Sequence, residues 1–212
     1  MEINYLGHSC FRLKGKDNTI LIDPFDESVG KLAKQKCDIL LNTHAHSDHN
    51  NNDVATDNKI FIENPGEYEI GGTFIYGFPT FHDDKQGTER GKNTIYLIDI
   101  EGYTVLHLGD LGHDLTKELL EKVGEVDVLM VPVGGNYTID AKKAVNIISQ
   151  IEPRFVIPMH YKTATLGKDI EIDSVDKFLD EMGAEDVKSE DKLTLSSRTN
   201  LPEETTVVIL NS

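Results

Sequence analysis

The segment THAHSDH, residues 43–49, brings three histidines and an aspartate together directly after an apolar run. His44 and His46 are two residues apart, so in an extended backbone both side chains point to the same side of the chain. Asp48 and His49 follow where the extended segment ends, and a turn there could direct them toward the same place. Neutral imidazoles are favoured ligands for zinc and related ions, and a carboxylate adds an oxygen ligand with negative charge. The pattern therefore predicts a metal site rather than a polar loop that happens to be rich in histidine.

A catalytic metal site uses three protein ligands and an open position, and two metals held together need more ligands. We expect the missing ligands at strand ends elsewhere in the chain. His82, Asp110 and His160 each close such a segment, in FIYGFPTFH, YTVLHLGD and RFVIPMH. The alternative for the two histidines is a buried structural role, and for Asp110 it is a turn-forming aspartate after a glycine.

Short apolar segments broken by Gly, Pro and charged residues predict a first half that is rich in strands. A helical turn is expected within residues 31–37. Beyond residue 110 helices and strands alternate, with Asp140 as the N-cap of the second helix and Pro153 as its stop. The predicted strands are 2–7, 9–15, 18–24, 38–42, 58–64, 71–82, 92–100, 103–110, 127–133, 154–158 and 205–210, and the predicted helices are 114–124, 140–152 and 174–183. Two sheets flanked by helices would accommodate both halves.

Several motifs in order resemble the metallo-β-lactamase superfamily: THAHSDH, a strand-end histidine, LGD at 108–110 and PMHY at 158–161. The flanking segments YLGHSCF, LIDP, NPGEYEI and GGNYTIDAKKA resemble more particularly the branch that contains L-ascorbate-6-phosphate lactonase and related metal-dependent hydrolases. The resemblance covers nearly the whole chain. It implies an α/β fold, a four-layer αβ/βα sandwich of two mixed β-sheets flanked by helices, in a single domain over residues 1–212.

The resemblance also implies a dinuclear metal site at the edge of the sandwich where strand-end loops meet. By position, the first metal would take His44, His46 and His82, and the second would take Asp48, His49 and His160, with Asp110 bridging the two. Zinc is favoured because most of these ligands are imidazoles, although the carboxylates also suit manganese or iron. We therefore expect two divalent ions as cofactors.

Five further residues are candidates for supporting these ligands or for binding substrate. In the resembled family an aspartate at Asp23 supports the histidine loop, because a ligand histidine needs a fixed partner on its second ring nitrogen. His8 would support the site and His113 would face the substrate, each with a merely packed histidine as the alternative. Tyr137 would help to bind substrate, or would serve only as a helix-entry residue. Lys162 would hold a substrate phosphate or carboxylate, or would be a solvated surface lysine.

The composition limits the partners that this chain can have. Its formal charge of −16 is spread along the chain and repels a phosphate backbone, so we expect no nucleic-acid partner. No apolar stretch approaches the roughly 18 residues that cross a bilayer, and no secretory pattern opens the chain, so we expect no membrane partner. The only two cysteines, Cys10 and Cys37, are too few for a disulfide framework. We expect a cytoplasmic protein, and a homo-oligomer is compatible with the sequence.

These features favour a metal-dependent hydrolase with Asp48 and Asp110 as its catalytic carboxylates. A hydroxide that bridges the metals would attack a small ester or lactone, an amide or a phosphodiester. The local positive charge of the metals would attract a small-molecule substrate, an anionic one included, despite the acidic surface. The alternatives are a di-iron redox protein of the same fold and a metal-binding protein without turnover.

Overall fold

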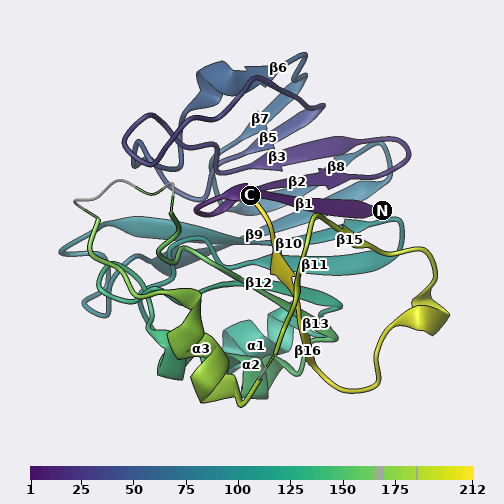
Figure 1. Ribbon diagram of the computed structural model, residues 1–212. Coiled ribbons are helices and arrows are strands. Elements are labelled where there is room, and N and C mark those ends of the chain that lie inside the picture. Colours follow the sequence, from purple (N-terminus) through teal and green to yellow (C-terminus); the bar gives the residue numbers. More distant parts are fainter. Residues whose placement is uncertain (165, 167–169, 185) are drawn as a thin grey trace.

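Two mixed β-sheets lie face to face in the computed structural model (Figure 1), which describes residues 1–164, 166, 170–184 and 186–212. The first sheet has the order β15-β1-β2-β3-β5-β7, and the second has the order β16-β13-β12-β11-β10-β9-β8. The strands of the first sheet are β1 (Glu2–Gly7), β2 (Cys10–Lys14), β3 (Thr19–Ile22), β5 (Ile39–Leu41), β7 (Ile60–Ile62) and β15 (Leu193–Thr194). Those of the second are β8 (Gly66–Ile70), β9 (Thr73–Phe81), β10 (Lys92–Ile100), β11 (Tyr103–His107), β12 (Val128–Pro132), β13 (Phe155–Met159) and β16 (Thr206–Val207).

Side-chain alternation along the strands of the first sheet divides the apolar residues between its two faces. Ile20, Ile22 and Leu41 belong to the large core that also contains the second sheet, whereas Leu21 and Leu40 belong to a smaller cluster on the opposite face. The main core includes residues from Ile3 near the beginning of the chain to Leu210 near its end. Both sheets are therefore held by one continuous apolar core.

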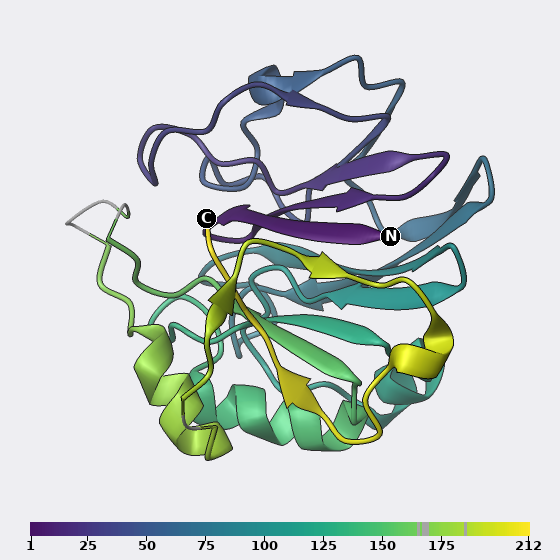
Figure 2. The ribbon, with the colours of Figure 1, turned by 45° about the vertical axis from the view of Figure 1, so that its right-hand side comes forward.

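The three described α-helices cover the outer face of the second sheet, as Figures 1 and 2 show. They are α1 (Lys117–Val123), α2 (Ala141–Ile151) and α3 (Val175–Met182). Residues Ala141, Ala144, Ile147 and Ile148 of α2 recur at helical spacing and are buried. Thr116 caps α1 by accepting from Leu119 N–H, and Asp140 caps α2 by accepting from Lys143 N–H, so the predicted N-cap is confirmed.

The outer face of the first sheet is covered by irregular segments in place of a helix. Phe25, Val29 and Val54 pack there against the buried thiols of Cys10 and Cys37. Val54 comes from the 3-10 helix η1 (Asn52–Val54), which lies near the paired short strands β4 (Gln35–Lys36) and β6 (Ala55–Thr56). The predicted sandwich of two mixed sheets is confirmed, with its described helices on one side.

Two details of the predicted secondary structure are wrong. Residues 31–37 form no helical turn: Leu32 is only half-buried and its neighbours are exposed, so a helix would bury too little apolar surface. The predicted strand 205–210 is divided at Val208, because β16 pairs with β13 while β17 (Ile209–Leu210) pairs with β14 (Ser189–Glu190). The sequence prediction also omitted the strands β4, β6, β8, β14 and β15, and the 3-10 helices η1 and η2 (Arg198–Asn200).

Strand direction brings the ends of several strands to one edge of the sandwich. In the first sheet β3 and β5 are parallel, and in the second β11, β12 and β13 are parallel. The segments that carry Asp23, His44, Asp110 and His160 all leave the carboxyl ends of these strands. Loops that follow parallel strands are the usual place for ligands in α/β sheets. None of the described helices has the length and apolarity needed to cross a lipid bilayer.

Candidate metal centre

His44, His46 and His82 form one group of imidazoles between the two sheets. His44 and His46 follow β5, and His82 directly follows β9. The nearest ring nitrogens of the three residues all lie within 4.8 Å of one another. His44 and His82 are buried, whereas His46 is exposed and forms the solvent side of the group. The structure thus brings together the three residues predicted to hold the first metal.

A second group contains Asp48, His49 and His160, and His8 lies with them. Their nearest ligand atoms all fall within 4.8 Å of one another. His160 follows β13, and its backbone N–H donates to His8 C=O at 2.8 Å, which joins the β1–β2 turn to the second sheet. His8 Nε2 donates to Asp48 Oδ2 at 3.3 Å. The His8 ring therefore contacts a candidate metal ligand, in agreement with the supporting role predicted for it.

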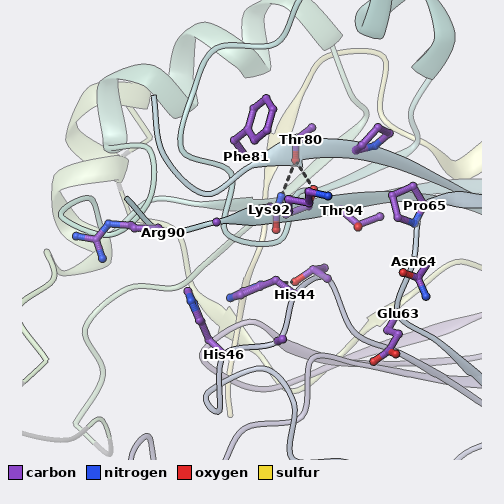
Figure 3. Close-up of a pocket in the computed structure, with 15 residues that line it drawn as sticks. His44, His46, Glu63, Asn64, Pro65, Thr80, Phe81, Arg90, Lys92 and Thr94 are labelled. Atoms are coloured by element: carbon purple, nitrogen blue, oxygen red, sulfur yellow. Dashed lines mark hydrogen bonds between the residues drawn. The ribbon is translucent and has the colours of Figure 1, made fainter. Parts of the chain in front are cut away.

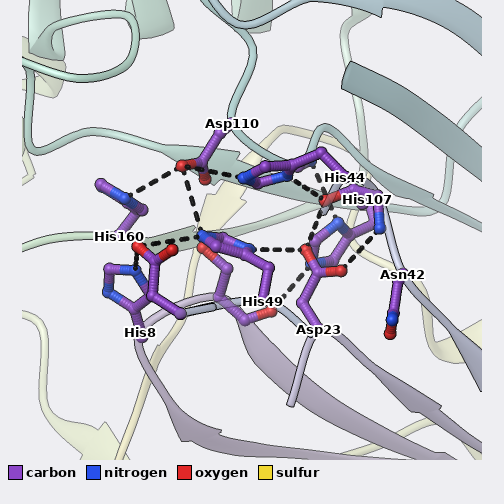
Figure 4. Close-up of polar contacts among 12 residues, drawn as sticks. His8, Asp23, Asn42, His44, His49, His107, Asp110 and His160 are labelled. Carbon is purple, nitrogen blue, oxygen red and sulfur yellow. Dashed lines mark hydrogen bonds and ion pairs between the residues drawn. The ribbon is translucent and has the colours of Figure 1, made fainter. Parts of the chain in front are cut away.

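Asp110 lies between the two groups, as Figure 4 shows for several of its neighbours. Its Oδ2 atom is 3.1 Å from His82 Nε2 and 3.2 Å from His160 Nε2. The same oxygen is 3.3 Å from His49 Nε2 and 3.9 Å from His44 Nε2. One buried carboxylate oxygen therefore faces imidazoles of both groups, which is the placement expected of a bridging ligand.

Asp23 fixes the orientation of the histidine loop from the side away from Asp110. Its carboxylate accepts from Thr43 N–H and from the Thr43 hydroxyl, both at 2.7 Å, and from His49 Nδ1 at 2.9 Å. Because the Thr43 hydroxyl donates to Asp23, its oxygen accepts from His44 Nδ1 at 2.9 Å. Both rings therefore keep Nε2 available on the side of Asp110, the second-nitrogen arrangement typical of metal-binding histidines.

Backbone conformation at the site is unusual for the residues that carry it. His8, Asp23 and His160 have φ values of 55°, 48° and 52°, in the left-handed region that non-glycine residues rarely adopt. Such strain persists only where surrounding contacts hold it, and it clusters at functional sites. Gly109, which precedes Asp110, has φ 54°, and a Cβ atom there would collide with Asn93 Oδ1.

Asn93 and His107 fix the strand ends from behind. Asn93 accepts from Asp110 N–H at 3.0 Å and donates to Thr80 Oγ1 at 2.8 Å, so it connects the strands that precede Asp110 and His82. His107 accepts from Gly109 N–H and donates to Ser9 C=O. Neither residue was assigned to the site from the sequence, since a buried asparagine on a strand carries no motif.

Burial keeps two of the imidazoles neutral. It lowers the pKa of His44 to about 3, an effect to which His49 adds, and the pKa of His8 to about 4, an effect to which His160 adds. Burial also lowers the pKa of the less buried His46. These rings are therefore unprotonated near neutral pH, which is the form that can bind a metal.

The carboxylates stay ionised although they are buried. Burial raises the pKa of Asp110, but the charges of His160 and His49 more than offset this and hold it well below its usual range. Burial opposes protonation of His49, yet Asp110 and Asp23 on either side raise its pKa well above the usual value. His49 thus carries a proton that a metal would displace from Nε2.

The donor atoms fit divalent cations. Among the described residues, His44 Nε2, His49 Nε2 and Asp110 Oδ1 are buried side-chain atoms without a hydrogen-bond partner. A buried polar atom left unpaired costs roughly 1–3 kcal/mol, so several in one place indicate a partner that is not protein. Imidazole nitrogens with carboxylate oxygens are the ligand types of zinc and also suit manganese and iron.

Comparison with known proteins agrees with this geometry. Residues 2–160 match the family model described as "Beta-lactamase superfamily domain". The chain belongs to this superfamily. It is 30% identical over 189 residues to a UPF0173 metal-dependent hydrolase from Natranaerobius thermophilus, covering 77% of this chain and 84% of that protein. A candidate Zn-dependent hydrolase of the metallo-β-lactamase superfamily from Thermotoga maritima superposes with a TM-score of 0.80 at 36% identity, over 99% of this chain and 97% of the other.

A further crystal structure shares the fold at lower identity. It is a metallo hydrolase from Ignicoccus hospitalis with a TM-score of 0.66 and 21% identity, over 92% of this chain and 99% of the other. On the family model, the relatives and the Thermotoga structure, the chain is a metal-dependent hydrolase of the metallo-β-lactamase superfamily. The finer resemblance to the ascorbate-phosphate lactonase branch stays a prediction.

Two of the predicted supporting residues of this hydrolase lie away from the metal centre's cavity. His113 Nε2 accepts from Phe81 N–H at 3.1 Å, and its Nδ1 donates to Asp114 C=O at 2.8 Å. Both ring nitrogens are thus bonded to backbone groups, and one of these, Phe81 N–H, directly precedes His82. Lys162 is exposed and lines a separate cavity with Glu171 and Asp173.

A cavity of about 200 Å³ opens over the metal centre of the hydrolase. Asp48, Asp110 and Tyr137 are among its lining residues, so the predicted place of Tyr137 near the substrate has a structural basis. Arg90 also lines this cavity and was not considered in the sequence analysis. Its segment, DDKQGTERGKN, is a polar loop with no recognisable motif, so only the folded structure reveals its position.

Proposed function

We propose that this protein hydrolyses a small ester or lactone, amide or phosphodiester with two divalent ions, of which zinc is favoured. The observation that carries the proposal is the position of Asp110 Oδ2, between 3.1 and 3.3 Å from Nε2 of His82, His160 and His49. One carboxylate oxygen shared by two groups of imidazoles is the arrangement that a pair of metals requires. Bound ions of this kind supply an activated water and an electrophile for the carbonyl or phosphoryl oxygen.

The ligands divide by their two groups. His44, His46 and His82 would hold one ion, Asp48, His49 and His160 would hold the other, and Asp110 would bridge them. Asp23 holds the second nitrogen of His49, and Thr43 holds that of His44, so the loop is aligned before metal binds.

Asp48 is the carboxylate placed to act on the reacting atoms. Its side chain is 31% exposed, unlike that of Asp110, and it lines the cavity over the metal centre. Burial raises its pKa, but the hydrogen bond from His8 and the charge of His49 outweigh burial and lower it. An ionised Asp48 would orient the attacking water and carry a proton toward the leaving group.

We also propose that residues 1–212 form one hydrolase domain. The main core runs from Ile3 to Leu210 and includes both sheets, which supports a single folding unit. Its substrate is a small molecule, since the cavity over the metal centre has a volume of about 200 Å³.

The test is an activity screen on purified protein loaded separately with zinc, manganese and iron. Lactones, para-nitrophenyl esters, amides, thioesters and phosphodiesters are the substrates. We expect about two metals per chain and loss of turnover when a chelator removes them. His46→Ala and Asp110→Ala should each deplete metal and abolish hydrolysis on soluble, folded material. Undiminished turnover in either variant would count against the proposal, and a visible iron spectrum with redox turnover would favour the di-iron alternative.

A further inference from the structure

Arg90 lies where two cavities meet beside the metal centre. The smaller cavity, of about 200 Å³, lies over Asp110, and the larger, of about 610 Å³, extends between the histidine loop and strands β9 and β10. His46 and Arg90 are the two residues that line both. Figure 3 shows them at the same end of the larger cavity. A ligand that reaches from one cavity into the other must pass the Arg90 side chain.

The loop that carries Arg90 is held by one buried carboxylate. Asp83 follows His82 and accepts from the backbone N–H groups of Lys85, Gly87, Glu89 and Arg90 at 2.7–3.0 Å. The backbone of Arg90 is therefore fixed relative to His82, and through it to the metal centre.

The Arg90 guanidinium is positioned but not neutralised. Its central carbon lies 4.8 Å from the centroid of the Tyr137 ring, and it donates to Asn136 C=O at 3.5 Å. Within the described residues no carboxylate lies at ion-pair distance from it, in a chain with 37 acidic residues. Arginine offers five N–H donors in a planar fork that matches carboxylate and phosphate oxygens. Most of these donors remain available to a ligand.

We propose that Arg90 binds an oxyanion, a carboxylate or phosphate group, on the substrate of this hydrolase. The proposal rests on the function proposed above and adds the class of substrate and the residue that selects it. No other arginine or lysine among the described residues lines the smaller cavity. The strongly acidic chain repels anions at long range, so an anionic substrate needs such a local cation. Tyr137 supports the guanidinium through its ring face and is a positioning residue.

The larger cavity takes the uncharged body of the same substrate. Pro65, Pro79 and Phe81 contribute apolar walls, and His44 and His46 close the end near the metals. The substrate is thus an ester, lactone or related compound with an anionic group near the scissile bond and a bulkier neutral part. A pocket with a few fixed polar groups and apolar walls is the usual form of a small-molecule site.

The test compares two chromogenic esters that differ by one charge. Para-nitrophenyl acetate is neutral, whereas para-nitrophenyl hydrogen succinate has a carboxylate on its acyl group and the same para-nitrophenolate leaving group. In the metal-loaded protein, Arg90→Gln should lower kcat/KM for the succinate ester about ten- to hundred-fold, mainly through KM. Activity on the acetate ester should stay within about three-fold, which also shows that the variant is folded. Arg90→Lys should lie in between, because it keeps the charge and loses the fork.

Lys85→Gln is the matched control. Lys85 belongs to the same loop and loses the same charge, but it is exposed and pairs with Glu89. Lys85→Gln should hydrolyse both esters with the kcat/KM of the wild type. Equal losses on both esters in Arg90→Gln, or no loss on either, would overturn the assignment of Arg90.

Calorimetry with inorganic phosphate separates this proposal from the hydrolase function. If the wild type hydrolyses neither ester, the choice of reaction has failed, and phosphate binding still tests Arg90. Arg90→Gln should bind phosphate at least about ten-fold more weakly than the wild type and Lys85→Gln, with the same metal content. Equal phosphate affinity in all three proteins, without a selective loss of activity on the succinate ester in Arg90→Gln, would overturn the proposal. If Arg90→Gln loses its selectivity for the succinate ester but binds phosphate normally, the group that Arg90 binds is a carboxylate. If the variant loses both the selectivity and the phosphate binding, Arg90 binds either kind of oxyanion.

Discussion

Asp23 Oδ2 lies 2.9 Å from His49 Nδ1, and this pair is completely buried. The same carboxylate also receives both donors of Thr43. It therefore holds the loop at Thr43 and at His49, and so directs the Nε2 atoms of His44 and His49 toward Asp110. Residues that lie behind the ligands in this way set ring orientation and ligand basicity.

Asp23→Asn should weaken zinc binding about ten- to hundred-fold, because an amide nitrogen would face donors that the carboxylate accepts. It should also reduce the free energy of unfolding by about 1–3 kcal/mol, since a buried donor is left unpaired. Chelator-competition titration measures the first effect and urea denaturation of the metal-free protein the second.

Glu27→Gln is the control for Asp23→Asn, because it removes the same charge from an exposed position in the following loop. It should leave both measurements unchanged. Zinc affinity equal to the wild type in Asp23→Asn would show that this carboxylate does not orient the ligands.

The sequence predicted the seven residues that now lie together because their signals are local. His44, His46, Asp48 and His49 lie in one short motif, and the other three close recognisable strands. Binary patterning places strand ends reliably when apolar runs are long, as in β9 to β13. Because β9, β11 and β13 run in the same direction, their carboxyl ends then lie at the same edge of the sandwich.

The positions that the sequence did not reveal depend on long-range contacts. Arg90 acquires its place from the Asp83 loop and from Tyr137, and Asn93 acquires its role from strands on either side. Lys162 follows His160 by two residues, yet the turn after β13 carries it into another cavity. Nearness in sequence to a ligand is therefore a poor guide to which cation faces the substrate.

The reactivity of the two cysteine thiols reports whether the outer face of the first sheet is covered. Cys10 and Cys37 are 0% and 1% exposed and are unpaired. Burial raises the pKa of Cys10, and burial together with the charge of Asp38 raises the pKa of Cys37 to about 11. At pH 8 the thiolate of Cys37 should be roughly a hundred times scarcer than that of an exposed cysteine, and reactivity should rise with pH.

Ellman's reagent should accordingly modify neither thiol of the native protein within minutes at pH 8, and both in urea. Cys37→Ala identifies which thiol reacts first if one does. Fast labelling of Cys37 in the native protein would show that the loops around Phe25 and Val54 do not seal this face.

Lys162→Ala should leave hydrolysis of anionic and neutral substrates within about two-fold of the wild type. Its side chain lies with Glu171 and Asp173 in a cavity of about 350 Å³ that shares no lining residue with the one over Asp110. A solvated surface lysine of this kind contributes little to the binding of a substrate in another cavity. Steady-state kinetics on the two para-nitrophenyl esters measures the effect. A ten-fold rise in KM confined to the anionic ester would make Lys162 the anion-binding residue and displace Arg90 from that role.

His113→Ala tests a ring that holds backbone beside a ligand. Removing the imidazole leaves Phe81 N–H without its acceptor, directly before His82. Because the site is only partly buried, water can replace part of the contact, and the free energy of unfolding should fall by about 1 kcal/mol. Zinc bound by the group that contains His82 should also weaken. Asp114→Ala is the control, since its backbone C=O still accepts from His113 Nδ1, and it should change stability by less than about 0.5 kcal/mol. Wild-type stability and zinc affinity in His113→Ala would mean that β9 positions His82 without this ring.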